Sequence, residues 1–437
     1  MVRFFYNLLI HTIGAPIILA YYAPKIIFNG KYSRSLRGKL GRLPDTFPED
    51  SLIRPVVWFH AVSVGEVVAL APVVREFRKL APDYTIIVST GTETGQEKAT
   101  TSINDVNAFI YLPIDFPVFV NPVIDRIMPD LFVLMETEIW PNLLHGLKAK
   151  GAIIALANGR ISDRSFPRYM KIRPFLARML GKIDAFLMVS ATDKERILDM
   201  GAPSERVQVV GNTKFDAALR NFSEETLREA QGILDVDEND MVLMAGSTHP
   251  GEHEQILDCF IKLRKGFPDL ILVIAPRHVE TVPSILTAIN DRKLEAPFVR
   301  SSFESGARRG SSNIVLLDTT GELFKFYSVA TVVVMGGSFV PRGGQNILEP
   351  IVWGKRVFFG PSMEDFRDAR DLMTAVGAAS EARDLDELCI SVSQALKDVK
   401  HSMKLGSLGR EELARHSGSA KTTAHLLFDL VSPAEKA

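Results

Sequence analysis

Short apolar runs recur along the chain and alternate with longer stretches in which apolar residues repeat at helical spacing. Near-continuous hydrophobic strands of this kind are typical of a parallel sheet that helices cover on both faces. The predicted strands of the first half are residues 56–59, 84–89, 131–135, 153–157, 186–189 and 207–210. Those of the second half are residues 241–245, 270–275, 314–317, 331–335 and 356–359. The pattern therefore predicts an α/β protein.

A polar and acidic segment, residues 223–240, separates the two series of strands and is expected to form a helical linker. Two doubly wound, Rossmann-like domains in tandem are the simplest account. We expect the first domain to span residues 24–220, the linker residues 221–240 and the second domain residues 241–437. Ligands of such sheets bind beyond the carboxyl ends of the strands, and a two-domain protein of this kind binds its substrate in a cleft between the domains.

The N-terminal segment, residues 1–23, is expected to attach the chain to a membrane. Residues 4–23 carry no formal charge. As a helix they would measure about 30 Å, which is just long enough to cross a bilayer. Polar and helix-breaking residues such as Asn7 and Pro16 dilute the segment, so a helix that lies in the membrane interface is an equal alternative.

A group of cations follows this segment, with no acidic residue before Asp45. The positive-inside rule places this side of the membrane in the cytoplasm. The cations either bind anionic lipid headgroups or form a solvated helix face. They are Lys25, Lys31, Arg34, Arg37, Lys39 and Arg42, here called the basic collar.

Composition excludes several classes of function. The formal net charge of -1 over 437 residues leaves no whole-chain field for binding nucleic acid. The two cysteines, Cys259 and Cys389, lie far apart in the sequence, which provides neither a CxxC zinc site nor a disulfide framework and favours a reducing cytoplasm. Residues 249–253 spell H-x-x-E-H, but Pro250 and Gly251 predict a turn, and we expect no metal site.

In the first domain, charged residues follow predicted strands directly. Glu66 stands at a helix start, where it either points into the cleft or only complements the helix dipole. Glu136 and Glu138 follow the predicted strand 131–135, and one of them is expected to orient a base while the other caps a helix. Lys214 suits an anionic substrate or leaving group, or else it pairs with Asp216 as an ordinary linker lysine.

In the second domain, the strand ends suit a sugar nucleotide. Arg277, after Pro276, is a fork for phosphate or carboxylate. Gly336 and Gly337 permit close approach of the backbone to a ligand. Asn346 and Glu349, three residues apart at a helix start, are suited to binding a ribose diol. No GxGxxG or P-loop pattern occurs, so a dinucleotide-binding domain or P-loop nucleotidase finds no support.

Taken in order, these motifs resemble those of the bacterial 3-deoxy-D-manno-octulosonic acid (Kdo) transferases, over nearly the whole chain. The motifs are HAVSVGE at 60–66, METEIWP at 135–141, GNTKFD at 211–216, PRH at 276–278, MGGS at 335–338 and GQNILE at 344–349. The resemblance implies a GT-B fold, in which two Rossmann-like domains face a cleft, the first binding mainly the acceptor and the second mainly the nucleotide. It also implies that the last helix, within residues 422–431, returns to the first domain.

The same resemblance implies inverting transfer of Kdo from CMP-Kdo to the lipid A precursor lipid IVA, and we expect no cofactor. Because CMP leaves with a single phosphate, which Arg, Lys and helix N-termini can stabilise, we also expect activity without a metal ion. The resemblance assigns Glu66 as the general base, with Glu136 and Lys214 assisting the transition state. The residues implied to hold CMP are Pro276, Arg277, Met335, Gly336, Gly337, Asn346, Ile347, Leu348 and Glu349.

A membrane amphiphile as acceptor would explain the N-terminus, and the expected location is the cytoplasmic face of the bacterial inner membrane. Two alternatives stay open. One is another membrane-associated GT-B enzyme that uses a UDP-sugar, because this fold accepts many donors. The other is a membrane-tethered sugar-nucleotide binder without catalytic activity.

Overall fold

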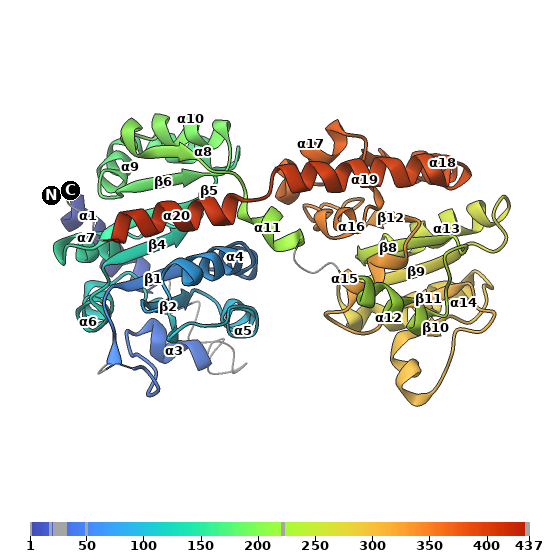
Figure 1. Cartoon of the computed structure of the whole chain (residues 1–437), viewed down its shortest axis with the longest axis horizontal. Helices are drawn as coiled ribbons and strands as arrows, with labels where there is room; N and C mark the ends of the chain where they lie inside the picture. Colours follow the sequence, from blue (N-terminus) through green and yellow to red (C-terminus); the bar gives the residue numbers. More distant parts are fainter. Residues whose placement is uncertain (1, 17–19, 21–32, 49–50, 220–222, 433–437) are drawn as a thin grey trace. The chain divides into compact units, whose positions relative to one another are not determined.

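The computed structural model describes residues 2–16, 20, 33–48, 51–219 and 223–432 (Figure 1). The chain divides into two compact units. Unit 1 consists of Met1–Ala217 and His416–Ala437, and unit 2 consists of Ala218–Arg415. Within the described residues, each unit contains a seven-stranded sheet in which all paired strands are parallel. The predicted pair of doubly wound, Rossmann-like α/β domains is confirmed.

The sheet of unit 1 has the strand order β3-β2-β1-β4-β5-β6-β7. Its strands are β1 Val56–Ala61, β2 Thr85–Thr90, β3 Ala108–Tyr111, β4 Leu131–Met135, β5 Ile153–Gly159, β6 Ala185–Met188 and β7 Val207–Val209. Its helices are α1 Val2–Leu9, η1 Ile10–Gly14, α3 Ser33–Lys39, α4 Val64–Leu80, α5 Glu93–Ser102, α6 Pro117–Ile127, α7 Pro141–Ala149, α8 Phe166–Lys171, α9 Arg173–Leu180, α10 Ala191–Asp199, η3 Ser204–Arg206, α11 Thr213–Leu219 and α20 Ser419–Val431.

The sheet of unit 2 has the strand order β10-β11-β9-β8-β12-β13-β14. Its strands are β8 Val242–Thr248, β9 Ile271–Pro276, β10 Phe298–Val299, β11 Ile314–Leu316, β12 Val332–Met335, β13 Arg356–Phe359 and β14 Ala379–Glu381. Its helices are α12 Glu224–Leu234, α13 His253–Arg264, η4 Val279–Thr281, α14 Val282–Asp291, η5 Arg300–Ser305, α15 Leu323–Phe326, η6 Tyr327–Val329, α16 Leu348–Val352, η7 Glu364–Phe366, α17 Arg367–Ala375, α18 Leu385–Lys397 and α19 Val399–Arg415.

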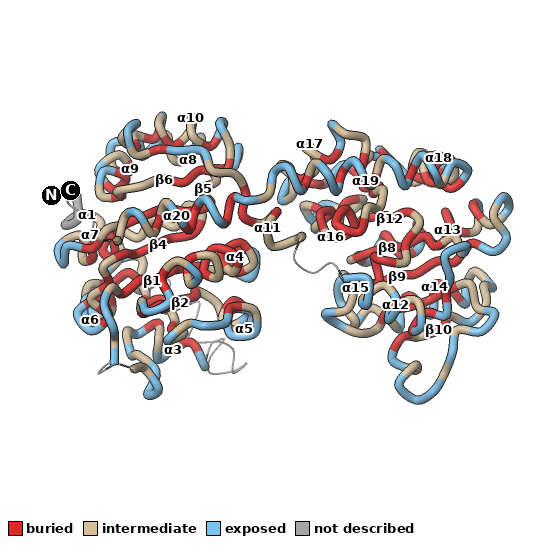
Figure 2. Tube along the Cα trace, viewed as in Figure 1, coloured by how far each residue is buried: buried red, intermediate tan, exposed pale blue. Residues whose placement is uncertain are grey.

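The central strands are buried on both faces, which explains their near-continuous apolar sequences (Figure 2). In β1, Trp58 packs edge-on against Phe132 in one core cluster. Phe59 points to the other face, where it meets Phe77 of α4. The C-terminal helix α20 covers that second face and contributes Leu427 to its core.

Each of the eleven predicted strands is present, and β3, β10 and β14 are the strands that the apolar pattern missed. These three are at most four residues long. Each lies near or at an edge of its sheet and has partly exposed residues, so none forms a continuous apolar run. Residues of the expected linker form α12, which packs within unit 2 because Ala230, Ile233 and Leu234 on one of its faces are buried.

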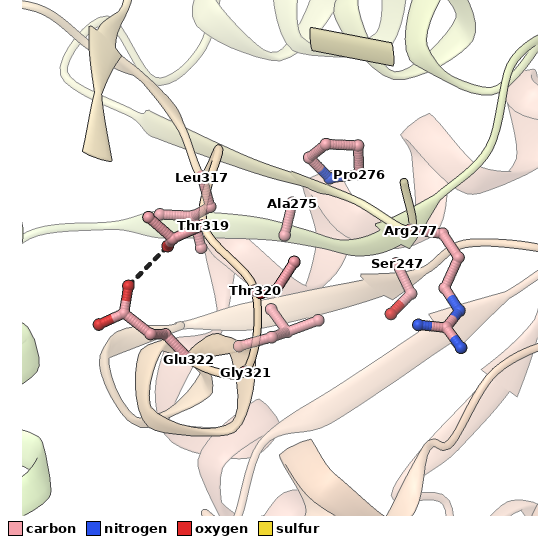
Figure 3. A pocket seen from close by; sticks show the side chains of 10 residues that line it. Ser247, Ala275, Pro276, Arg277, Leu317, Thr319, Thr320, Gly321 and Glu322 are labelled. Atoms are coloured by element: carbon pink, nitrogen blue, oxygen red, sulfur yellow. Dashed lines mark hydrogen bonds between the residues drawn. The ribbon is translucent and has the colours of Figure 1, made fainter. Parts of the chain in front are cut away.

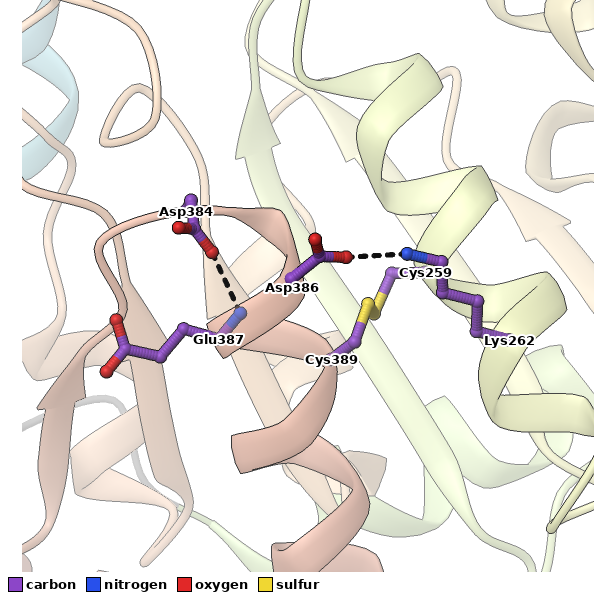
Figure 4. The surroundings of a disulfide bond; sticks show 6 residues. All are labelled: Cys259, Lys262, Asp384, Asp386, Glu387 and Cys389. Carbon is purple, nitrogen blue, oxygen red and sulfur yellow. Dashed lines mark hydrogen bonds and ion pairs between the residues drawn. A yellow bond between two sulfur atoms is a disulfide. The ribbon is translucent and has the colours of Figure 1, made fainter.

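The two cysteines form a disulfide that the sequence analysis did not expect (Figure 4). Their separation along the chain does not prevent a disulfide, because α13 and α18 pack side by side and bring the two Cα atoms within 5.5 Å of each other. An ion pair of 2.7 Å between Lys262 and Asp386 joins the same two helices.

Part of the expected membrane segment, residues 17–19 and 21–23, lies outside the described residues. In the part of the chain that is described, no helix has the length and apolar character needed to cross a membrane. The helix α1 is held against unit 1 by two hydrogen bonds. The Tyr6 hydroxyl donates to Asp115 at 2.9 Å, and the Asn142 side chain donates to that of Asn7 at 2.7 Å.

Two cations of the basic collar, Arg34 and Lys39, face acids of α5. Lys25 and Lys31 lie outside the described residues. Arg34 pairs with Glu97 at 3.2 Å. Lys39 is buried, and burial lowers its pKa while nearby Glu93 raises it. The absence of acids along the chain therefore does not mean that the collar is unopposed in space.

Candidate active site

The candidate residues gather where each sheet reverses its strand order. In unit 1 the strand order reverses between β1 and β4, because β2 and β3 follow on one side of β1 and β5, β6 and β7 follow on the far side of β4. In unit 2 the reversal lies between β8 and β12. Loops that leave neighbouring strands in opposite directions open a crevice at their carboxyl ends, which is where ligands of such sheets bind. Glu66 and Glu136 follow β1 and β4, whereas Glu252 and Gly336 follow β8 and β12.

Glu66 is held at the start of α4 by a reciprocal cap. Ser63 precedes the helix, and its hydroxyl accepts from the Glu66 backbone N–H at 3.4 Å. The carboxylate in turn accepts from the Val62 N–H at 2.8 Å and from the Ser63 hydroxyl at 3.1 Å. This arrangement differs from a capping box only in that the carboxylate reaches the N–H of Val62, one residue before the N-cap Ser63, and it explains why Ser and Glu stand three residues apart. It leaves Glu66 only 7% exposed.

The pKa of Glu66 is raised to about 7. Burial is the largest cause, because it disfavours the charged carboxylate. The Val62 N–H acts in the opposite direction, and the carboxylates of Glu136 and Glu138 raise the pKa further. The two glutamates after β4 are therefore close enough to Glu66 to interact with it electrostatically.

Glu136 pairs with Lys214, at 2.9 Å between Oε1 and Nζ. Glu136 adopts a left-handed backbone conformation with φ of 54°, held by its N–H bond to Ala157. Lys214 lies in the first turn of α11, whose start is fixed by the buried side chain of Thr213. That hydroxyl donates to the Ala69 carbonyl of α4 at 2.8 Å, so both members of the pair are positioned by the core.

The alternative pairing of Lys214 with Asp216 is not what the structure shows. Asp216 instead accepts from the backbone N–H groups of Gly418 and Ala420, at 2.6 and 3.1 Å. It thereby holds the first turn of α20, where the chain returns to unit 1.

The corresponding glutamate of unit 2, Glu252, has a different environment. Its carboxylate accepts from the N–H groups of His249, Gly337, Ser338 and Phe339, at 2.8, 2.8, 3.1 and 2.9 Å. The N–H of Gly336 donates to Gly246 of the neighbouring strand. The backbone donors of the strand-end glycines are thus engaged within the protein, and Glu252 rather than a ligand fills the turn after β12.

The other predicted nucleotide residues divide into buried and accessible ones. The side chains of Met335, Ile347 and Leu348 are buried in the core, so only their backbone atoms are available to a ligand. The Asn346 side chain accepts from the Leu348 N–H at the start of α16, and it donates to Glu349 at 3.3 Å. The predicted Asn346 and Glu349 pair is therefore brought together.

A pocket opens at the ends of β8, β9 and β11 (Figure 3). It includes the predicted Pro276 and Arg277. It also includes residues that the sequence analysis missed, namely Ser247, Ala275, Leu317, Thr319, Thr320, Gly321, Glu322 and Leu323. The polar stretch 318–322 directly follows a predicted strand, so the rule that ligands bind beyond strand ends could have identified it.

Cations surround His249 at the same edge of the sheet. Burial lowers the pKa of His249, the Glu252 carboxylate raises it, and His278, Arg342 and Arg277 lower it further, which places three basic side chains and one acid near it. Within the described residues, no group of three or more His, Cys, Asp or Glu side chains is arranged to hold a metal ion. The basic side chains at this edge are suited to binding an anion.

Comparison with known proteins identifies relatives over the whole chain. Residues 34–217 match the family described as 3-deoxy-D-manno-octulosonic-acid transferase (kdotransferase). A 3-deoxy-D-manno-octulosonic acid transferase of Haemophilus influenzae is 31% identical over 437 residues, which are 99% of each chain. A bifunctional glycosyltransferase/methyltransferase of Fusobacterium nucleatum is 39% identical over 315 residues, and these make up 71% of this chain but 48% of that protein.

Solved structures share the fold at lower identity. The chain is similar to UDP-GlcNAc 2-epimerase from Neisseria meningitidis bound to UDP-GlcNAc, with a TM-score of 0.59 and 13% identity. The match covers 86% of this chain and 99% of that one. At this identity the similarity concerns the fold alone.

Replacing Glu252 with alanine should destabilise unit 2 by about 3 kcal/mol or more, because each buried N–H left without an acceptor costs about 1–3 kcal/mol. Denaturant unfolding followed by circular dichroism would measure the change. Glu254→Ala is the matched control on the same helix, and its exposed side chain should contribute no more than about 0.5 kcal/mol. Equal stability of the two variants would contradict the role of Glu252.

Proposed function

The chain belongs to the 3-deoxy-D-manno-octulosonic-acid (Kdo) transferases, and on this basis we propose that its donor is CMP-Kdo, its acceptor lipid IVA and its stereochemical outcome inversion. It is a glycosyltransferase that transfers Kdo in lipopolysaccharide biosynthesis, with two Rossmann-like, GT-B-like domains. The active-site roles and the membrane location argued below are parts of the proposal.

The buried carboxylate of Glu66 carries the proposal. Inverting transfer to a hydroxyl needs one base that removes its proton. A carboxylate whose pKa lies at about 7 meets this need, because it is substantially deprotonated at neutral pH and still basic enough to accept a proton. Each carboxylate oxygen has two lone pairs, and only one donor bonds each oxygen of Glu66, so an acceptor position remains for the substrate.

Glu136 and Lys214 are proposed to stabilise the transition state. Bond cleavage at the anomeric carbon develops positive charge on the sugar ring, which a nearby carboxylate stabilises. Lys214 has three N–H donors, and its bond to Glu136 uses one of them. The remaining donors are suited to negative charge on the substrates, while the ion pair keeps both side chains in place.

CMP is proposed to bind unit 2 through Pro276, Arg277, Asn346 and Glu349, with the buried Met335, Gly336, Gly337, Ile347 and Leu348 shaping the site around it. Tyr327 connects the two parts of this site. Burial raises its pKa, and the carboxylate of Glu349 raises it further, while the Tyr327 hydroxyl also bonds Ser247 of the pocket. Glu349 therefore lies beside the pocket that Arg277 lines.

The rate of Kdo transfer should depend on Glu66 in two ways. The value of kcat/KM should rise as the pH increases through about 7, because only the deprotonated carboxylate accepts a proton. Glu66→Gln should lower kcat by about 10²- to 10⁴-fold at pH 8. Mass spectrometry of the product formed from CMP-Kdo and lipid IVA in detergent would measure both effects and would count the Kdo residues added.

Two variants separate Glu66 from other titrating groups. Glu205→Gln neutralises a largely exposed carboxylate of unit 1 and should leave the pH profile unchanged. Glu66→Asp shortens the side chain, weakens its bonds to Val62 and Ser63, and should move the inflection. If the inflection of Glu66→Asp stays at the wild-type pH, the titrating group is a phosphate of the acceptor and not Glu66. Full activity of Glu66→Gln would exclude Glu66 as the base.

Transfer should not require a metal ion. CMP leaves with a single phosphate, and arginine, lysine and helix N-termini can stabilise that charge without chelation of a pyrophosphate. Exhaustive EDTA treatment followed by gel filtration should leave the transfer rate within about twofold of the untreated enzyme. Loss of activity that a divalent ion restores would contradict metal independence.

The N-terminal segment is proposed to bind the cytoplasmic face of the inner membrane. Tyr6 and Asn7 face unit 1, whereas Leu8, Leu9 and Ile13 are 50, 55 and 53% exposed. An aliphatic face on a docked helix suits insertion into a lipid interface. Arg37 and Arg42 of the basic collar are exposed as well and can approach anionic headgroups.

The double variant Leu8→Ser and Leu9→Ser should bind vesicles of anionic lipid about tenfold more weakly, because it removes the two aliphatic side chains of α1 whose exposure the structure describes. Transfer to vesicle-embedded lipid IVA should fall in parallel, while CMP binding should not change. Ile390→Ser with Met403→Ser is the control, since these side chains of unit 2 are 59 and 60% exposed. Equal loss of vesicle binding in both double variants would refute the assignment to α1.

A further inference from the structure

The pocket of unit 2 has two chemically different sides (Figure 3). Arg277 and Ser247 line one side, where a charged group of a ligand finds a cation. Thr319 and Leu317 line the opposite side, and Ala275 lies between the two sides. A bound nucleotide has the same division, with an anionic phosphate at one end and a flat, neutral base at the other.

The side around Thr319 offers no free cation to a phosphate. Arg300 and Lys325, the nearest basic residues in the hydrogen-bond network, both pair with Oε1 of Glu322, each at 3.0 Å. Apart from Arg277 and Glu322, the residues that line the pocket are uncharged. Uncharged walls with a few fixed polar groups suit a neutral aromatic ring better than an anion.

The Thr319 hydroxyl is the polar group at this end, and its proton is already committed. It donates to Oε2 of Glu322 at 2.6 Å. Burial alone raises the pKa of Glu322, but the bonds from Thr319, Lys325 and Arg300 outweigh burial and hold that pKa below its ordinary value. Glu322 is therefore ionised and only accepts, which fixes the direction of the bond from Thr319.

A hydroxyl whose proton is committed can only accept a bond from a ligand. Cytosine and uracil differ at this point, since cytosine carries an N4 amine that donates and uracil carries an O4 oxygen that accepts. We propose that Thr319, oriented by Glu322, is the residue that selects cytosine over uracil in the donor nucleotide. The inference rests on the proposed CMP-Kdo donor and adds the residue that recognises its base.

Selection then depends on the network beneath the pocket as well as on Thr319. Arg300 is 6% exposed and also bonds Glu304, so the Glu322 carboxylate is held by a buried cation that does not line the pocket. A uracil nucleotide would set its O4 against the lone pairs of Thr319 and would find no donor there. The cost of such an unpaired contact is the basis of the discrimination.

The test measures binding of CMP and of UMP to the full-length protein by titration calorimetry. Wild type should prefer CMP by about tenfold or more, as expected for one hydrogen bond gained and one unpaired acceptor avoided. Thr319→Val keeps the shape of the side chain and removes the hydroxyl. It should weaken CMP binding by about tenfold, leave UMP binding within about twofold and so abolish the preference.

Two further variants distinguish recognition from a structural effect. Thr319→Ser retains the hydroxyl and should retain the preference for CMP. Thr287→Val makes the same chemical change on an exposed position of α14 and should alter neither affinity. A Thr319→Val variant that keeps the preference, or that loses CMP and UMP equally, would overturn the role of Thr319 while leaving the CMP donor intact. Wild type that binds neither nucleotide would instead overturn the donor assignment itself, and the base selection with it.

Discussion

The structure depends on carboxylates that accept backbone N–H groups where parallel strands end. Loops that leave the centre of a sheet are partly buried, and their backbone donors need partners other than water. Acidic side chains supply these partners throughout the chain. Asp115 holds the start of α7 through Asn142 and Leu143, and Asp216 holds the start of α20. The acids that shape the loops are thus placed at the same edges of the sheets where ligands bind.

A comparison of Glu66 and Glu252 shows how one arrangement supports two different roles. Both follow a glycine after the first strand of their unit, and both are buried. Four backbone N–H groups occupy Glu252, so its charge is compensated and its lone pairs are used. Glu66 receives one backbone N–H and faces other carboxylates, and its pKa rises to about 7. The number of donors around each carboxylate, rather than the local sequence, separates a structural acid from a candidate base.

The sequence predicts most of the fold because the central strands are buried on both sides and must be apolar along their whole length. Strands such as β3 and β14 lie near sheet edges, where one face meets solvent and the apolar run is interrupted. Candidate site residues such as Glu66 and Arg277 could be predicted because they follow apolar runs closely, and the end of such a run marks the end of a strand. The pairing of Cys259 with Cys389 and of Arg34 with Glu97 joins separate helices, and such contacts depend on packing that spacing along the chain does not encode.

The two units also divide the charges that the proposed reaction requires. Glu66, Glu136 and Glu138 make the site of unit 1 acidic apart from Lys214, which suits a proton in transit and a sugar ring that gains positive charge. Arg277, His278 and Arg342 make the edge of unit 2 basic, which suits a phosphate. An acidic donor site would repel the nucleotide, and a basic acceptor site would lower the pKa of Glu66 and weaken it as a base. Separate domains allow both electrostatic conditions to hold in a single chain.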